Sequence, residues 1–166
     1  MAELTQKERL QPSLLDRLTD KDPSSKRESK DRRVLSTQQL RDAVLRDLAW
    51  LLNTDNLHDL DLEAHPLVAS SVLNFGMRDL TGATASSLDG KQLKARLVQA
   101  IKDFEPRIDP KSLSVTVLLS EESYNQNSVS FEIKAQLWAE PVPLDLLLKT
   151  EIDLERGDVT VEEVAG

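Results

Sequence analysis

The stretch VSFEIKAQLWA, Val129 to Ala139, decides the fold, because apolar residues occupy every second position in it. A period of two is typical of a strand with one buried face and one exposed face. On the exposed face we expect the intervening residues Ser130, Glu132, Lys134, Gln136 and Trp138. The stretch therefore predicts a half-buried strand of an antiparallel sheet.

Three further stretches predict the rest of this sheet. Ser112–Leu119 alternates in the same way, and Leu146–Leu154 follows a break at Pro141-Val142-Pro143. Arg156-Gly157-Asp158 supplies a turn into a short Val159–Val161 strand. Consecutive strands with short connections predict an antiparallel meander whose first and last strands are its edges.

Helices precede the sheet. Ser36 with Gln39 forms the pattern of a capping box, and an apolar stripe follows as far as Asn53-Thr54. Another helix is expected to begin at Asp89 and to end before Pro106, which cannot continue a helix. The two apolar stripes are Leu40, Val44, Leu48, Leu51 and Leu52, and Leu93, Leu97, Ala100, Ile101 and Phe104.

A helix is also predicted between these two, from Pro66 to Asn74-Phe75-Gly76. Pro66 suits a first helical position, and Gly76 suits a left-handed cap. Val68, Val72 and Leu73 are expected to point inward. The predicted fold class is thus α+β, with N-terminal helices packed on one face of a small antiparallel meander of three to four strands, and with a flexible N-terminal extension.

Composition excludes several classes of protein. The 166 residues contain no cysteine, so no disulfide, zinc–thiolate site or thiol nucleophile is possible, and a net charge of −8 is atypical of nucleic-acid binders. Five glycines never occur at nucleotide-binding spacing, and we expect no cofactor or metal. The chain lacks a signal-peptide pattern and any apolar run near ~18 residues, so we expect it in the cytoplasm.

The first 35 residues differ from the rest, with a net charge of +2 against −10 for the remainder. Ser25–Arg33 has no aliphatic or aromatic residue and is predicted to be a flexible tether. Upstream, Leu14, Leu15 and Leu18 share one helical face. They form either a docking peptide for a partner or a short helix packed on its own domain. We therefore divide the chain into residues 1–35, a docking peptide with a charged tether, and an α+β domain over residues 36–166.

Phe104-Glu105-Pro106-Arg107-Ile108 lies where the last helix gives way to the sheet. Phe104 and Ile108 are expected to hold the segment on the core, so that Glu105 and Arg107 emerge at the junction. A bidentate contact between the two charges would fix the reversal of the backbone. The alternative is a simple helix terminator with two solvated charges.

Enzymatic chemistry has little support in the sequence. A serine nucleophile needs a histidine base, and both histidines, His58 and His65, lie in a polar connector between predicted helices. Paired carboxylates would suffice for a glycosidase, but the acidic residues follow exposed faces and sugar-stacking aromatics are scarce. We therefore assign no catalytic residue and expect a protein that is not an enzyme.

Several short motifs in a fixed order resemble one protein family. They are PSLLDRL from Pro12, RVLS from Arg33, LRDAVLRDL from Leu40, SVLNFG from Ser71, DLTG from Asp79 and FEPRI from Phe104. In this order they resemble the gene-25-like family of contractile phage-tail wedge proteins, and within it the TssE subunits of type VI secretion baseplates. The resemblance extends from about Pro12 to the last strand.

The resemblance implies a structural role. Such subunits lie on the cytoplasmic side of the inner membrane, assemble with the baseplate subunits TssF, TssG and TssK, and help to start the TssB/TssC sheath. Strand addition at an open sheet edge would suit that role, and Glu105, Pro106 and Arg107 would meet partners at the junction. The alternative function is a lysozyme-like glycosidase that degrades peptidoglycan.

Overall fold

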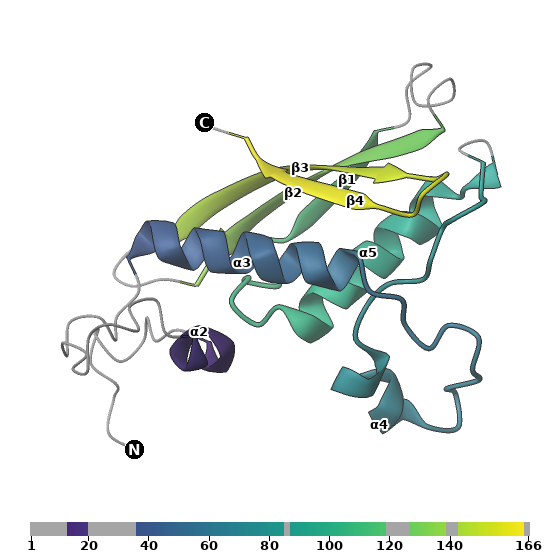
Figure 1. Ribbon diagram of the computed structural model, residues 1–166, viewed down its shortest axis with the longest axis horizontal. Coiled ribbons are helices and arrows are strands. Elements are labelled where there is room, and N and C mark those ends of the chain that lie inside the picture. Colours follow the sequence, from purple (N-terminus) through teal and green to yellow (C-terminus); the bar gives the residue numbers. More distant parts are fainter. Residues whose placement is uncertain (1–12, 20–35, 85–86, 119–126, 139–142, 165–166) are drawn as a thin grey trace.

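The structure is a computed structural model that describes residues 13–19, 36–84, 87–118, 127–138 and 143–164. It is an α+β fold, in which helices and a four-stranded antiparallel sheet form two layers (Figure 1). The predicted fold class is therefore confirmed. The tether Ser25–Arg33 and the position of Leu119 lie outside the described residues.

The sheet is the predicted meander. Its strands are β1 (Ser114–Leu118), β2 (Ser128–Leu137), β3 (Leu144–Asp153) and β4 (Val159–Glu163), in the spatial order β1-β2-β3-β4. All neighbouring pairs are antiparallel, and β1 and β4 are the two edges. β2 and β3 are the longest strands because both are paired along their whole length.

Two long helices cover one face of the sheet (Figure 1). α3 (Thr37–Leu52) begins at Ser36 with the predicted capping box, in which Gln39 N donates to Ser36 Oγ over 3.2 Å and Ser36 N donates to Gln39 Oε1 over 2.9 Å. α5 (Gly90–Phe104) begins at Asp89, whose carboxylate accepts from two backbone amides of the first turn. Both predicted apolar stripes face the sheet, Phe104 being only partly buried. The fully buried core side chains that carry most volume are Leu48, Leu51, Leu97, Ile101, Phe131, Ile133, Leu137, Leu146, Leu148 and Leu154.

The prediction of a helix from Pro66 to Gly76 is wrong. That stretch forms α4 (Pro66–Ala69), a single turn, and the 3-10 turn η2 (Val72–Asn74). Leu73 and Val72 point to solvent and are 70% and 82% exposed. The break has a local cause, since Ser71 Oγ accepts from Leu73 N and starts a new turn there. Asn74 then ties the turn back, its Nδ2 donating to Ala69 O over 2.8 Å.

Gly76 is predicted to cap that helix in a left-handed conformation; it does have a positive φ, of +125°, but follows the 3-10 turn η2 and not a continuous helix. A Cβ there would lie 2.2 Å from the carbonyl oxygen of Thr54, which itself accepts from Met77 N. We expect Gly76→Ala to lower the free energy of unfolding by about 2 kcal/mol, because the strain of a positive φ adds to a backbone clash.

Gly82 offers a matched control for this substitution. It also has a positive φ, of 81°, but a Cβ there meets no atom within 4 Å. Gly82→Ala should cost about 1 kcal/mol from the backbone conformation alone. Urea unfolding of both variants measures the difference, and equal losses would show that the close approach at Gly76 is relieved without cost.

Candidate functional site

Glu105 and Arg107 form an ion pair at the point where α5 ends. Glu105 is 3% exposed, and its Oε1 accepts from Arg107 Nε over 2.6 Å and from Arg107 N over 3.1 Å. Arg107 Nη2 donates to Glu105 Oε2, so the contact is bidentate. Pro106 between them prevents α5 from continuing, which lets two residues so close in sequence face one another. The interpretation of this motif as a terminator with solvated charges does not describe this geometry.

The backbone next to this pair is fixed to the sheet. Trp138 N donates to Arg107 O over 2.7 Å, and Asp109 N donates to Gln136 O over 2.9 Å. Ile108, between them, bridges to Leu137 and is buried. The segment after α5 therefore continues the edge of β2 beyond the end of β1. It holds the ion pair at the seam between the helical layer and the sheet.

Asp47 on α3 is a third member of this cluster, which the sequence did not indicate. Its Oδ2 accepts from Arg107 Nη2 over 2.6 Å, and the two side chains are equally accessible. Burial alone would lower the pKa of Arg107, but the hydrogen bond and charge of Glu105, with those of Asp47, outweigh burial and raise it. Arg107 therefore stays charged and joins α3, α5 and β2. One buried nitrogen of its guanidinium, Nη1, has no partner in the described part of the chain.

The charge cluster extends from Asp47 to the N-terminal segment. Arg46 Nε donates to Asp47 Oδ1 over 2.9 Å, and Arg46 Nη1 donates to Asp16 Oδ1 over 2.6 Å. The Arg46 guanidinium also lies 5.1 Å from the ring centre of Trp50. The hydrogen bond to Asp16, against some desolvation, raises the pKa of Arg46 further above its ordinary value. Acidic and basic side chains thus alternate along one continuous series of contacts, Asp16–Arg46–Asp47–Arg107–Glu105.

Asp16 belongs to α2 (Leu14–Leu18), a single helical turn that begins after Ser13. Its leucines are not covered by the domain: Leu14, Leu15 and Leu18 are 70%, 46% and 74% exposed. In the described structure, α2 is therefore held beside α3 by charge while its apolar side chains face solvent. This arrangement does not bury the leucine face in cis. Whether a partner covers it stays a prediction.

The hydrogen-bonding direction of β2 identifies the open positions of edge strand β1. Leu154 N donates to Asn127 O, so the backbone groups of odd-numbered β2 residues point toward β3. Because directions alternate in an antiparallel ladder, the even-numbered residues, among them Glu132, point toward β1. Thr116 is the register partner of Glu132, so its backbone N–H and C=O groups point inward, toward β2. The backbone groups of its neighbours on β1 point outward, to the open edge.

Those neighbours are Val115 and Val117. Their outward N–H and C=O groups have no hydrogen-bond partner among the residues that the structure describes. The side chain of Val115 is fully buried, and that of Val117 packs partly against the core. The edge of β1 therefore presents unpaired N–H and C=O groups on a strand whose side chains pack against the core. This is the geometry that accepts an added strand.

The opposite edge is partly blocked by a side chain. Asn53, at the end of α3, donates from Nδ2 to Val159 O and accepts from Val159 N at Oδ1, both over 2.8 Å. One amide side chain thus satisfies both outward backbone groups at the start of β4, as a neighbouring strand would. Val161 and Glu163 remain outward on β4, and the Glu163 carboxylate pairs with Arg41.

The sequence also raised the questions of a metal site, a membrane-spanning segment and the roles of the two histidines. They contain no cluster of three or more His, Cys, Asp or Glu side chains able to hold a metal ion. Within the same ranges no helix is long and apolar enough to cross a membrane. His65 precedes α4 and makes no capping hydrogen bond from its side chain, whereas His58 lies between the carboxylates of Asp55 and Asp59 at 3.1 and 3.2 Å.

The described site thus consists of an ion-pair cluster where the helices meet the sheet and an open edge at β1, which can pair with a strand of another protein. Comparison with protein families gives the class: the family described as "Baseplate wedge protein gp25" matches residues 38–142. The chain belongs to this family, which implies a structural role in a baseplate and assembly with other baseplate components. No curated protein and no solved structure matches the chain.

Proposed function

We propose that this protein is the TssE-type wedge subunit of a type VI secretion baseplate and that it starts the contractile sheath. It lies in the cytoplasm against the inner membrane, within a wedge of TssF, TssG and TssK. There it accepts a strand from the first TssB/TssC sheath subunit at the edge of β1. Membership of the baseplate wedge family supports the structural role, and the unpaired outward groups of Val115 and Val117 carry the mechanism.

The edge of β1 suits this role better than that of β4. Asn53 already occupies the first outward position of β4, at Val159, and the side chain of Glu163 is held by Arg41. On β1 both outward positions are free in the described structure. Each added backbone hydrogen bond contributes only about 1 kcal/mol, so templating needs several in register.

Hydrogen exchange tests this mechanism at single amides. In the free protein the amides of Val115 and Val117 should exchange fast, whereas the amide of Thr116 is bonded to β2 and exchanges slowly. When purified TssB/TssC is added, exchange at Val115 and Val117 should slow by about tenfold or more. A complex that forms without this change would show that β1 accepts no strand, and protection at Val161 instead would place strand addition on β4.

We further propose that Leu14, Leu15 and Leu18 dock onto another wedge subunit. Their exposure beside a charge-fixed turn supports this, since a helix packed in cis would bury them. Deleting residues 1–24 should lower the melting temperature by no more than about 3 °C, the worth of one partly exposed ion pair. Co-purification with TssF and TssG should weaken strongly.

A variant with serine at the three leucine positions is the matched control for this deletion, because it keeps Asp16 and its contact with Arg46. It should lose co-purification to the same extent while melting like the unaltered protein. A large fall in melting temperature for either variant would show that the segment packs on its own domain.

A further inference from the structure

Three arginines of the described chain have no ion pair and no side-chain hydrogen bond: Arg78, Arg96 and Arg156. Of the other arginines whose side chains the structure describes, Arg41, Arg46 and Arg107 are each paired with a carboxylate. This difference is notable in a chain with a net charge of −8, where acidic partners are in excess. A guanidinium left free among so many carboxylates is available to an outside group.

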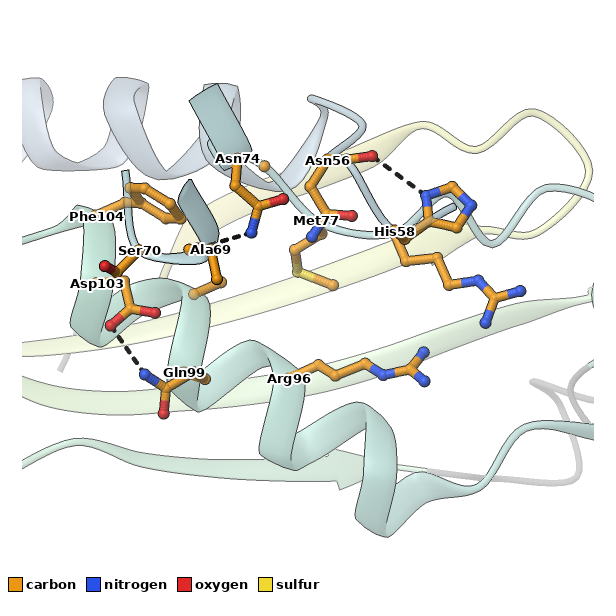
Figure 2. Close-up of a pocket in the computed structure, with 13 residues that line it drawn as sticks. Asn56, His58, Ala69, Ser70, Asn74, Met77, Arg96, Gln99, Asp103 and Phe104 are labelled. Atoms are coloured by element: carbon orange, nitrogen blue, oxygen red, sulfur yellow. Dashed lines mark hydrogen bonds between the residues drawn. The ribbon is translucent and has the colours of Figure 1, made fainter. Parts of the chain in front are cut away.

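The free arginines line adjoining cavities. A cavity of about 520 Å³ lies between the turn formed by α4 and η2 and the helix α5, and both Arg78 and Arg96 line it. A second cavity, of about 300 Å³, shares Arg78 and is lined by Arg156. Figure 2 shows Arg96 extended along α5, across the cavity from His58 and Asn56. We call the first cavity, with Arg78 and Arg96, the arginine groove.

Carboxylates near the arginine groove are engaged by other groups. Asp103 accepts from Gln99 Nε2 over 2.8 Å (Figure 2). Asp79 accepts from the hydroxyl and the amide of Thr81, and the hydroxyl bond above all lowers the pKa of Asp79. Both carboxylates are therefore held by uncharged donors. They leave the donors of Arg78 and Arg96 open to solvent.

The wall of the groove formed by α4 and η2 also carries exposed apolar side chains. Leu67, Val72 and Leu73 are 85%, 82% and 70% exposed, which makes this the most exposed aliphatic group of the described domain outside α2. Inside the groove the buried oxygen Oδ1 of Asn56 lacks a hydrogen-bond donor in the described structure. The groove thus combines free cations with exposed aliphatic side chains on the elements that form one of its walls.

We propose that the arginine groove binds an acidic segment of another protein, whose carboxylates pair with Arg78 and Arg96 and whose aliphatic side chains cover Leu67, Val72 and Leu73. A peptide fits better than a nucleic acid because it can place uncharged residues beside Asp103, which lines the groove, whereas every unit of a phosphate backbone is charged and would be repelled there. α4, at one wall of the groove, lies on the side of the long helices that faces away from the sheet (Figure 1).

The test uses a displayed random-dodecapeptide library against the immobilised full-length protein. We expect enrichment of peptides that combine Asp or Glu with Leu, Ile or Val. The best peptide, labelled with fluorescein, should bind the variant R78E/R96E about tenfold or more weakly by anisotropy, and rising salt should weaken its binding to the unaltered protein. Val72→Ser with Leu73→Ser should also weaken it.

Lys91 and Lys94 provide the matched control. Both lie on α5, are exposed, and line neither cavity, so K91E/K94E makes the same change in net charge away from the groove. This variant should bind the peptide within about twofold of the unaltered protein, with circular dichroism confirming that both double variants are folded. The proposal is wrong if selected peptides show no acidic bias, if R78E/R96E binds them equally well, or if a single-stranded DNA 12-mer binds more tightly than the best peptide.

Discussion

Replacing Arg107 with alanine should destabilise the protein by about 3 kcal/mol, because the change leaves the buried carboxylate of Glu105 without a cation. Asp47 loses its contact with Arg107 in the same step. The free energy of unfolding, measured in urea at neutral pH, gives the loss directly. Because Arg107 joins α3, α5 and the end of β2, the variant should also reduce co-purification of the wedge and secretion by cells.

The companion variants separate charge from shape. Glu105→Gln keeps an oxygen that accepts from Arg107 Nε and from its backbone amide, so it should cost about 1 kcal/mol. The double variant Glu105→Gln, Arg107→Ala removes the unpaired charge and should be less destabilised than the sum of the single variants. Additive losses would show that the two side chains do not act as a pair. A normal baseplate and normal firing in both single variants would reduce the motif to a helix terminator.

Local sequence signals predict the scaffold of this fold well. The capping box at Ser36 and the proline after α5 act within one helical turn. The alternation of apolar and polar residues in β2 arises because one face of the strand packs against the core. The two residues of the ion pair could be predicted because proline forces the chain to turn between them. Each of these signals depends on neighbours within about four residues, which is the range in which backbone geometry restricts the outcome.

The parts that sequence missed depend on tertiary placement. Asp47 lies 60 residues from Arg107, and Asn53 lies 106 residues from Val159, so no spacing rule links them. The helix predicted over residues 66–76 is wrong because the prediction relies on the local spacing of apolar residues alone. Their apolar side chains have a helical period, but α4 ends at Ser70 and a new turn begins at Ser71, which leaves Val72 and Leu73 exposed. An apolar residue at helical spacing is therefore not always a core residue, and here it marks a surface.

The edge of β1 unites these findings with the proposed function. An edge strand that receives a strand from another protein binds more tightly when it is already ordered. Otherwise part of the binding free energy is lost in ordering it. The burial of Val115 and the ladder to β2 supply that order, while the outward groups remain free. Asn53 closes only the start of β4 with a side chain, and this difference between the two edges is why we propose strand addition at β1.

Proline at two neighbouring positions of β1 should have opposite consequences. Thr116→Pro removes an inward N–H that bonds to β2 and should unfold the sheet, as judged by circular dichroism. Val117→Pro removes only an outward N–H and should leave a folded protein, because proline is tolerated on the free side of an edge strand. We choose Val117 over Val115 because the latter is fully buried, and its replacement would add a packing loss.

The folded Val117→Pro variant should abolish nearly all fluorescent sheath foci in cells while still joining the wedge. The missing donor and the proline ring would both obstruct an incoming strand at the middle of a short edge. Val161→Pro on β4 is the matched control, since it removes an outward donor from the edge that Asn53 partly occupies, and it should leave foci at their normal number. Loss of foci with Val161→Pro alone would move the templating edge to β4. Normal foci with both folded variants would rule out strand addition, and side-chain contacts on the helical layer would then have to start the sheath.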